Sequence, residues 1–232
     1  EFPFGPSVPL YEETYVVPRT PVLATDLENG TLRLNMGEFA EDRAEFVRRD
    51  GTLTTTLDVV VSPEDDAEVR RVSIANTGSQ ARDIELTSYA EIALAPQAAD
   101  AAHQAFSKMF VQTEYLASAG AILATRRRRS PGEAERWVAH LAVVEGEAVG
   151  EVEVETDRAR FLGRGNTPRT PVALSAQDTL SDSEGSVLDP IVAIRCRIEL
   201  APGQTAMIDM VHGVGLDRDA CAGLIDKYRD RR

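Results

Sequence analysis

The sequence predicts an all-β protein, a sandwich of two antiparallel sheets with one helix near the C-terminus. Three observations support this. Apolar and polar residues alternate over many short segments, clusters of Gly, Pro, Asn and Asp separate these segments, and a single stretch has clear helical spacing. The count comes to about ten or more strands, at the spacing typical of a sandwich or barrel.

The segment 44–95 has the clearest alternation, and we predict that it forms an antiparallel meander. Its runs are separated by Asp50-Gly51, by 62–66 and by 76–79, all rich in turn-forming residues. Period-two alternation places the apolar residues of each strand on one face. These residues are Leu53, Leu57, Val59 and Val61 in one run and Ile84, Leu86, Ala90, Ile92 and Leu94 in another.

Before the meander, residues 1–20 are rich in Pro and predict an arm with one extended piece near 12–17. Glu28-Asn29-Gly30 predicts a hairpin between 22–27 and 31–36. Glu1-Phe2 resembles a cloning scar, so we expect the chain to be an excised fragment.

After the meander, the Ala-rich segment 96–104 is expected to hold a helical turn, and 161–185 is a long loop. Further strands are expected over 105–116, 121–126, 136–144, 150–156, 191–200 and 205–214. In the strand 191–200, we expect Val192, Ile194, Cys196, Ile198 and Leu200 to face the core and Arg195, Arg197 and Glu199 to face outward.

The C-terminal segment 217–229 begins with a capping Asp217 and spaces its apolar residues as one helix does. The predicted organisation is therefore an extended arm over 1–20, a β-sandwich domain over 21–216, and the start of a further helix over 217–232.

Composition limits the function. Hydrophobic residues make up 43% of the 232 residues, enough for a substantial core. The formal net charge of −13 argues against a nucleic-acid-binding protein, which needs a basic surface, and against binding to an anionic membrane surface. Cys196 and Cys221 are the only cysteines, so a disulfide framework is not expected. We identify no signal peptide and no apolar run of roughly 18 residues.

Catalytic and metal-binding motifs are not evident. His103, His140 and His212 are far apart and have no metal-ligand spacing. A nucleophile elbow, a phosphate-binding loop and a dinucleotide fingerprint are all absent, so we expect no metal and no cofactor. The run 126–129 is four arginines, which we interpret as an edge beside a turn that is either solvated or paired at an interface. The run 64–66 is interpreted as an acidic turn rather than a calcium site.

Six residues are candidates for carbohydrate contact. Trp137, the only Trp, is expected in the core, with a sugar-stacking platform as the alternative. His103 and Phe106 follow the Ala-rich segment and either line a groove or pack normally. Arg164, Asn166 and Arg169 lie in the long loop, where their planar donors suit recognition of hydroxyl groups.

Strings spread along residues 40–232 resemble the β-sandwich domains of family-94 glycoside phosphorylases, and most closely a domain of bacterial cyclic β-1,2-glucan synthases. They include VSPEDDAEVRRVSIANTGS, ELTSYAEIALAP, ADAAHQAFSKMFVQTEY, RRRRSPGE, ETDRARFLGRGNTP, VLDPIVAIRCRIELAPGQT and DKYRDRR. In one departure, only residues 31–43 stand where relatives have a longer segment rich in Tyr, Trp and Arg. We therefore expect either that one or two edge strands are missing or that the first forty residues come from elsewhere.

The resemblance implies a galactose-mutarotase-like supersandwich that precedes a linker helix and a catalytic α/α barrel. The barrel would carry the general acid and the phosphate site, so no catalytic residue is assigned here. The implied parent is a large inner-membrane enzyme that processes β-1,2-glucan on the cytoplasmic side, with this fragment itself soluble and not inserted in the membrane.

Three functions stay open. The first is a non-catalytic accessory domain that docks against the α/α barrel and contacts glucan. The second is a hexose mutarotase or epimerase, which would need a paired acid and base such as His212 and a Glu in one groove. The third is a purely structural spacer.

Overall fold

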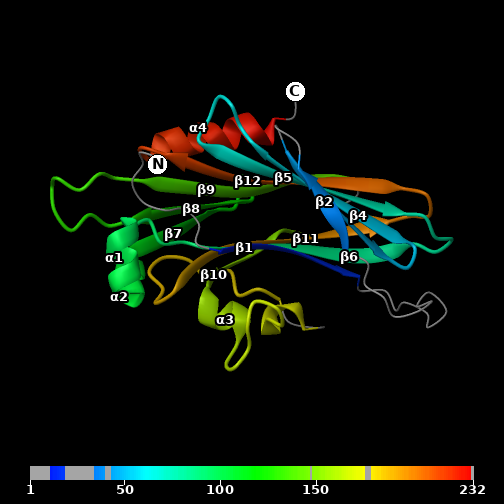
Figure 1. Cartoon of the computed structure of the whole chain (residues 1–232), viewed down its shortest axis with the longest axis horizontal. Coiled ribbons are helices and arrows are strands. Elements are labelled where there is room, and N and C mark those ends of the chain that lie inside the picture. The colour runs from blue at the N-terminus through cyan, green and yellow to red at the C-terminus, as the bar shows by residue number, and fades with distance from the viewer. Residues whose placement is uncertain (1–10, 19–33, 40–42, 147, 176–178, 231–232) are drawn as a thin grey trace.

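The computed structural model describes residues 11–18, 34–39, 43–146, 148–175 and 179–230. Within these, two antiparallel sheets lie face to face, which confirms the predicted fold class (Figure 1). The four-stranded sheet has the order β1 (Tyr11–Pro18), β6 (Arg82–Glu91), β11 (Pro190–Leu200), β10 (Glu153–Asp157). The eight-stranded sheet has the order β2 (Leu34–Phe39), β3 (Ala44–Asp50), β4 (Leu53–Val61), β5 (Ala67–Asn76), β12 (Thr205–Gly215), β9 (Trp137–Glu145), β8 (Ala121–Arg126), β7 (Val111–Leu116).

Helices occupy the ends and outer faces of this sandwich. They are α1 (Gln97–Ala102), α2 (Gln104–Lys108), α3 (Arg158–Leu162), the 3₁₀ turn η2 (Val172–Leu174) and α4 (Arg218–Arg229). Figure 1 shows α1 and α2 at one end of the sandwich, α3 on the outer side of the four-stranded sheet, and α4 on the outer side of the eight-stranded sheet. The predicted hairpin over 22–36 falls largely outside the described residues.

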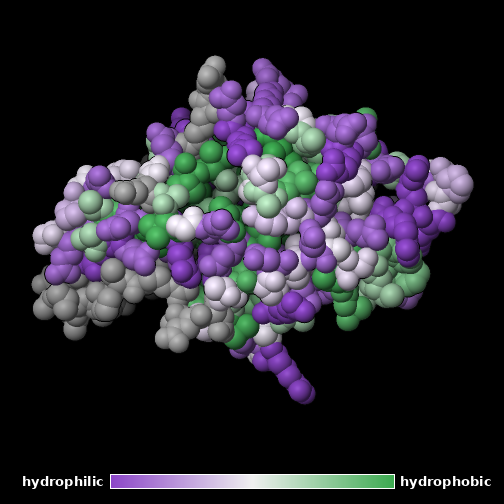
Figure 2. All heavy atoms as spheres, turned by 180° about the vertical axis from the view of Figure 1, so that it is seen from behind, coloured by the Kyte–Doolittle hydropathy of each residue, from purple (hydrophilic) through white to green (hydrophobic). Residues whose placement is uncertain are grey.

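The inward faces of the two sheets form the main core. Its fully buried members include Val72, Ile74, Leu86, Ile122 and Ile208, together with the alternating residues predicted for β6 and β11. Cys196 is among them, as expected, and burial raises the pKa of its thiol to about 12. Figure 2 shows hydrophobic residues gathered in the middle of one face of the molecule, between hydrophilic ones.

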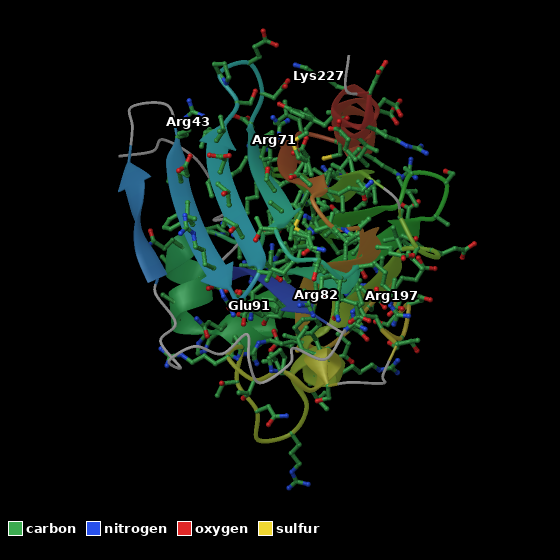
Figure 3. The ribbon with its side chains drawn as sticks, turned by 90° about the vertical axis from the view of Figure 1, so that its right-hand side faces the viewer. Arg43, Arg71, Arg82, Glu91, Arg197 and Lys227 are labelled. Carbon is green, nitrogen blue, oxygen red and sulfur yellow. The ribbon has the colours of Figure 1, made fainter. Side chains whose placement is uncertain are left out.

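The C-terminal helix forms as predicted. The Asp217 carboxylate accepts a hydrogen bond from the backbone N–H of Ala220, and Cys221 and Ile225 pack against the outer face of the eight-stranded sheet. The end of α4 is tied to the β4–β5 turn, because Lys227 donates to both Glu64 and Asp65 (Figure 3). The acidic turn is thus an anchor for the helix.

The predicted single meander is wrong in one respect. Strands β3, β4 and β5 do run as a meander, but β6 belongs to the opposite sheet. Asn76 is buried at this corner, where its side-chain amide donates to the carbonyls of Gln80 and Leu200, at 2.8 and 3.0 Å. Alternation shows which residues share a face but not which sheet a strand joins, so the crossover was invisible in the pattern.

Two other segments also differ from expectation. The start of the expected strand 105–116 is helix α2, because Phe106 and Phe110, four residues apart, fit helical spacing as well as strand alternation. The expected long loop 161–185 begins inside α3 and contains η2. Its buried residues Phe161 and Leu180 pack on the outer face of the four-stranded sheet, so this segment is a cover for the sheet and not a free loop.

Substitution of Asn76 by Ala is expected to lower the free energy of unfolding by about 1–3 kcal/mol, because buried carbonyls at the corner lose their donor. Urea unfolding followed by circular dichroism measures this. Ser79, exposed in the same turn, is the matched control, and Ser79→Ala should change stability by no more than about 0.5 kcal/mol. Equal effects of the two substitutions would show that the Asn76 amide does not stabilise the corner.

Candidate functional site

Two histidines lie side by side between the sheets, His140 on β9 and His212 on β12. Their ring centroids are 4.3 Å apart. His140 Nδ1 lies 3.1 Å from the Val211 carbonyl oxygen, and Nε2 lies 2.7 Å from the Ser88 hydroxyl on β6 of the other sheet. Because a carbonyl can only accept, Nδ1 carries the proton and Nε2 accepts from Ser88. His140 therefore links the two sheets through a neutral ring.

Burial keeps both rings uncharged near neutral pH. It lowers the pKa of His140 to about 4, and it lowers the pKa of His212 well below the usual range, with Arg70 and His140 adding to the effect. Glu68 on β5 is the cross-strand partner of His212, so a His and a Glu do stand on neighbouring strands. The Glu68 carboxylate, however, accepts a 2.7 Å bond from Arg70 Nε, and His212 Nε2 is buried. An acid–base pair open to a sugar is not assembled at this position.

A second set of polar side chains connects α2, β6, α3 and the start of β11. Lys108 Nζ donates to Asp189 at 2.8 Å and to Glu91 at 3.3 Å, and Arg158 Nε donates to Glu91 at 2.7 Å. The Tyr89 hydroxyl also donates to Glu91, at 2.8 Å. We call these five residues the charged cluster. It connects four elements that are distant in the sequence.

The charges of this cluster balance one another. Burial raises the pKa of the Glu91 carboxyl, but the hydrogen bonds from Arg158 and Tyr89 and the charge of Lys108 outweigh it, so the pKa lies below its usual value. Burial, with the bond to Glu91, raises the pKa of Tyr89. Lys108 Nζ is therefore engaged with two carboxylates that belong to distant parts of the chain.

Arg195, expected to face outward, does lie on the outer face of β11 but is only 1% exposed. Its guanidinium donates to Glu153 at 3.2 Å, to the Thr87 hydroxyl at 3.3 Å and to the Ala173 carbonyl in η2. The predicted orientation is confirmed, but the side chain is buried because the segment after α3 covers this face, which alternation within one strand cannot reveal.

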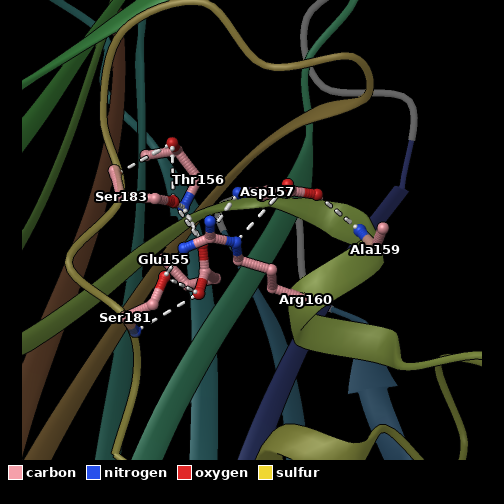
Figure 4. Close-up of polar contacts among 7 residues, drawn as sticks. All are labelled: Glu155, Thr156, Asp157, Ala159, Arg160, Ser181 and Ser183. Carbon is pink, nitrogen blue, oxygen red and sulfur yellow. Dashed lines mark hydrogen bonds and ion pairs between the residues drawn. The ribbon is translucent and has the colours of Figure 1, made fainter.

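Glu155 on β10 is also buried and fully engaged (Figure 4). One carboxylate oxygen accepts from the backbone N–H groups of Thr156 and Asp157, each at 3.0 Å, and from the Ser183 hydroxyl. The other accepts from the Ser181 hydroxyl at 2.7 Å. These bonds hold the segment around 181–183 against β10, so this carboxylate serves the fold.

The six predicted carbohydrate contacts are distributed over three separate surfaces. Arg164, Asn166 and Arg169 are exposed together on the turn between α3 and η2. His103 and Phe106 are exposed at the junction of α1 and α2. Trp137 lies on the outer face of the eight-stranded sheet, half-buried and packed against the layer under α4, with Nε1 donating to Glu135 at 2.7 Å. The structure thus brings together two groups and leaves Trp137 apart.

Phe106 and Met109, on and directly after α2, are two of the exposed large apolar side chains among the described residues, which are otherwise spread over several elements. Phe106 is 49% exposed, Met109 is 52% exposed and Leu188, next to Asp189 of the charged cluster, is 74% exposed. The Phe106 ring meets the Phe110 ring edge-on at 5.1 Å, and the Arg127 guanidinium lies 5.6 Å from the Phe110 ring.

Comparison with known proteins assigns the chain to a family. Residues 35–231 match the family model of the glycosyl hydrolase 94 supersandwich domain. The chain belongs to this family, which confirms the supersandwich architecture. Over 191 residues, 82% of the chain, it is 41% identical to the cyclic beta-(1,2)-glucan synthase NdvB of Rhizobium meliloti (strain 1021). The match spans only 7% of the length of NdvB.

Two solved structures match the chain at low identity. A bacterial glucoamylase complexed with acarbose is 9% identical, with a TM-score of 0.50, over 94% of this chain and 28% of that chain. A candidate aldose 1-epimerase of Escherichia coli K12 is 10% identical, with a TM-score of 0.41, over 78% of this chain and 68% of that one. No helix in the described part of the chain is long and apolar enough to cross a membrane.

Sequence reasoning missed the charged cluster and the Arg195 contacts. Their members are spread over most of the chain, and no local spacing joins them. One signal was available, since Lys108 is one of only two lysines in a chain whose other basic side chains are mostly Arg. That signal alone could not have identified Glu91 or Asp189 as its partners.

Acidification is expected to destabilise the protein through His140. Its pKa in the folded chain, about 4, lies below that of an unfolded His, so the unfolded chain binds the proton first. The stabilisation is complete above the unfolded pKa of about 6.5 and is lost as the pH falls toward 4. Between pH 6.5 and 5 the free energy of unfolding should fall by on the order of 1–2 kcal/mol, a window that lies above the carboxylate pKa values.

Urea unfolding at stepped pH checks this. His140→Gln should make the profile in that window less steep, with the remaining slope due to His212, whereas His103→Gln, at an exposed position, should leave it unchanged. A profile that is equally steep in both variants would contradict the assignment to His140.

Replacement of Lys108 by Met is expected to cost about 2–4 kcal/mol of stability, because Glu91 and Asp189 would lose a cation in a largely buried site. The only other lysine is the matched control. Lys227→Met also removes two ion pairs, but they are exposed, and its effect should be much smaller. Urea unfolding at neutral pH compares the two, and equal losses would show that the charged cluster does not stabilise the fold.

Proposed function

We propose that this chain is a non-catalytic accessory domain of a β-1,2-glucan-processing enzyme, that it packs against a catalytic α/α-barrel domain of the same polypeptide, and that it contacts glucan. Membership of the glycosyl hydrolase 94 supersandwich family and the identity to a cyclic beta-(1,2)-glucan synthase support the enzyme class. The family resemblance also supports the further proposal that the parent enzyme works at the cytoplasmic side of a bacterial inner membrane.

The state of the paired histidines supports the non-catalytic role. A mutarotase or epimerase needs an acid and a base that reach one substrate in a groove. Here the rings of His140 and His212 are buried against each other, and Glu68 is held by Arg70. The buried carboxylates Glu91 and Glu155 are likewise occupied by several donors each. These groups are used to hold the sandwich together, which disfavours the epimerase alternative.

Glucan contact is proposed at the turn that carries Arg164, Asn166 and Arg169, with His103 as a separate candidate. The turn is exposed but firmly based, because Phe161 and Leu162 at the end of α3 are buried against the four-stranded sheet. Gly163 follows them at a φ of 78°, a conformation that favours glycine, and it turns the chain outward. Exposed planar donors on a fixed turn suit hydroxyl groups of a sugar chain.

The isolated chain is expected to release neither glucose nor glucose 1-phosphate from β-1,2-glucan, with or without phosphate, because the paired histidines and the engaged carboxylates of the described residues are held by other groups of the fold. It should also leave the mutarotation rate of α-D-glucose at the buffer value. Sugar release above a blank, measured enzymatically, would contradict the non-catalytic role. Faster mutarotation in a polarimeter, lost in His212→Gln, would establish the epimerase alternative.

Titration with β-1,2-gluco-oligosaccharides is expected to shift backbone NMR signals around Arg164 and Asn166, with a Kd near the millimolar range, about −4 kcal/mol. Arg164→Ala should weaken these shifts. Arg218→Ala is the matched control, since it removes an exposed arginine on α4, and it should leave them unchanged. No shift at saturating sugar would remove glucan contact from the proposal and favour a spacer that only docks.

A further inference from the structure

We infer that residues 180–186, which we call the strap, close the sandwich along the side of β10 and β7 and keep these two edge strands from pairing with strands of other molecules. This role is independent of sugar binding and of packing against another domain, so it goes beyond the proposed function. The sequence predicted only a long loop, 161–185, over most of this segment.

The two strands that the strap contacts each end a sheet. β10 is the last strand of the four-stranded sheet, and β7 is the last strand of the eight-stranded sheet. An edge strand presents backbone N–H and C=O groups that its own sheet does not use, and these groups can pair with a strand of another molecule. A soluble β-protein therefore needs some device that blocks its edges.

On the β7 side, the strap occupies the edge with both backbone and side-chain groups. Gly185 and Thr113 exchange two backbone hydrogen bonds, at 2.8 and 2.9 Å. The Tyr115 N–H, two residues further along the same edge, donates to the Glu184 carboxylate at 2.8 Å. The N–H groups that Thr113 and Tyr115 direct away from their own sheet are therefore already bound.

On the β10 side, the strap binds mainly through side chains. The Asp182 N–H donates to the Val154 carbonyl at 2.9 Å, and the Asp182 carboxylate accepts from the Val154 N–H at 3.0 Å. The Thr156 N–H, which also donates to Glu155, donates to the Ser183 hydroxyl at 3.2 Å. The Thr156 hydroxyl donates back to the Ser183 carbonyl at 2.9 Å (Figure 4). The edge of β10 is thus occupied as well.

The strap ends both sheets and does not add a further strand to them. The side chains of Asp182, Ser183 and Glu184 take the places that a neighbouring strand would fill with backbone carbonyls. Asp182 has a φ of 51° and Gly185 a φ of 92°, values that an extended strand avoids. A positive φ is unfavourable for Asp and persists where the surrounding contacts require it. The strap itself therefore offers no regular edge to a partner.

Contacts near its two ends hold the strap closed. At the start, Leu180 is buried against the four-stranded sheet, and its N–H donates to Glu153 at 2.9 Å. Just after the end, Asp189 accepts from Lys108 at 2.8 Å. In between, the Ser181 and Ser183 hydroxyls donate to Glu155. Opening requires the loss of many of these bonds together, so we expect the strap to stay closed in the native state.

An uncovered β7 would pair with β7 of a second copy of this chain. β7 comprises Val111–Leu116, and identical edges of two copies meet in antiparallel orientation about a two-fold axis perpendicular to the sheet. Each copy would then supply the acceptors that the strap supplies now. Without the strap, the eight-stranded sheet would continue from one molecule into the next.

Gly185→Pro is expected to release the strap from β7, because proline has no N–H for the Thr113 carbonyl and cannot adopt a φ of 92°. Amide exchange of Thr113 and Tyr115, followed by NMR, should become at least about tenfold faster in the monomer. At moderate salt, which screens the net charge of −13, sedimentation equilibrium should show a concentration-dependent dimer. The unchanged chain is expected to stay a monomer.

Gly150→Pro is the matched control, since Gly150 is exposed, has a φ of 76° and lies outside the strap. It should change neither the exchange of Thr113 nor the monomeric state. In the Gly185→Pro dimer, Thr113 and Tyr115 should be protected again, because the new pair of strands uses their N–H groups. A dimer without this protection would form through another surface and overturn the inference.

Single side-chain changes test the strap even if Gly185→Pro does not fold. Glu184→Ala removes the acceptor of the Tyr115 N–H, so exchange should become faster at Tyr115 and not at Val154. Asp182→Gly removes the acceptor of the Val154 N–H without straining the backbone, and it should have the reverse effect. The two substitutions together should also produce the dimer.

Two further results would overturn the inference. Unchanged exchange at Tyr115 and Val154 in these variants would show that the strap does not cover the edges. A chain whose edges exchange faster but which stays a monomer at every concentration would show that the cover does not prevent pairing. Neither result bears on the proposed accessory role, which the sugar measurements test separately.

Discussion

The structure depends on the burial of the four-stranded sheet on both of its faces. The inner face of β6 and β11 packs against the eight-stranded sheet through residues such as Leu86 and Ile194. The outer face is covered by Phe161, Leu180 and the η2 turn. A sheet covered twice excludes water from polar side chains as well as apolar ones, and most of the other features of the chain follow from that exclusion.

Charged side chains on the covered face must be paired. Arg195 is fully buried, and its guanidinium donates hydrogen bonds to Glu153, to the Thr87 hydroxyl and to a carbonyl of η2. The Glu155 carboxylate accepts hydrogen bonds from hydroxyl and backbone N–H groups of the segment that crosses over it. An unpaired charge in such a place would cost several kcal/mol, so each contact also fixes the position of the covering segment. Buried polar groups here determine where the covering segments lie.

The same contacts support the surfaces that we propose to be functional. The charged cluster holds α2, and α2 begins directly after His103. The buried end of α3 holds the turn that presents Arg164 and Asn166. His140 joins the two sheets through a neutral ring. The molecule is therefore interpreted as a rigid support with exposed contact residues at its periphery, as expected of an accessory domain.

The sequence by itself determined the elements whose pattern is local. The strand 121–126 was predicted at its exact limits, the inward residues of β11 were all correct, and Asp217 caps α4 as its position indicated. In each case the physical cause, whether alternation of side chains across a strand or a carboxylate at a helix start, acts between residues close in the chain.

Only the tertiary structure decided what depends on distant segments. The alternation of apolar and polar residues could not show that β6 lies in a different sheet from β5. In both sheets, every second residue of a strand faces the core, so the pattern looks the same. It could not show that Arg195 is buried, because the covering residues begin more than thirty positions earlier, at Phe161. It placed Phe106 in a strand, although the residue lies in α2, because a spacing of four residues fits both a strand and a helix. Arg127 lies over the ring of Phe110, just after α2, only because the two segments meet in space, and such a meeting has no local signature.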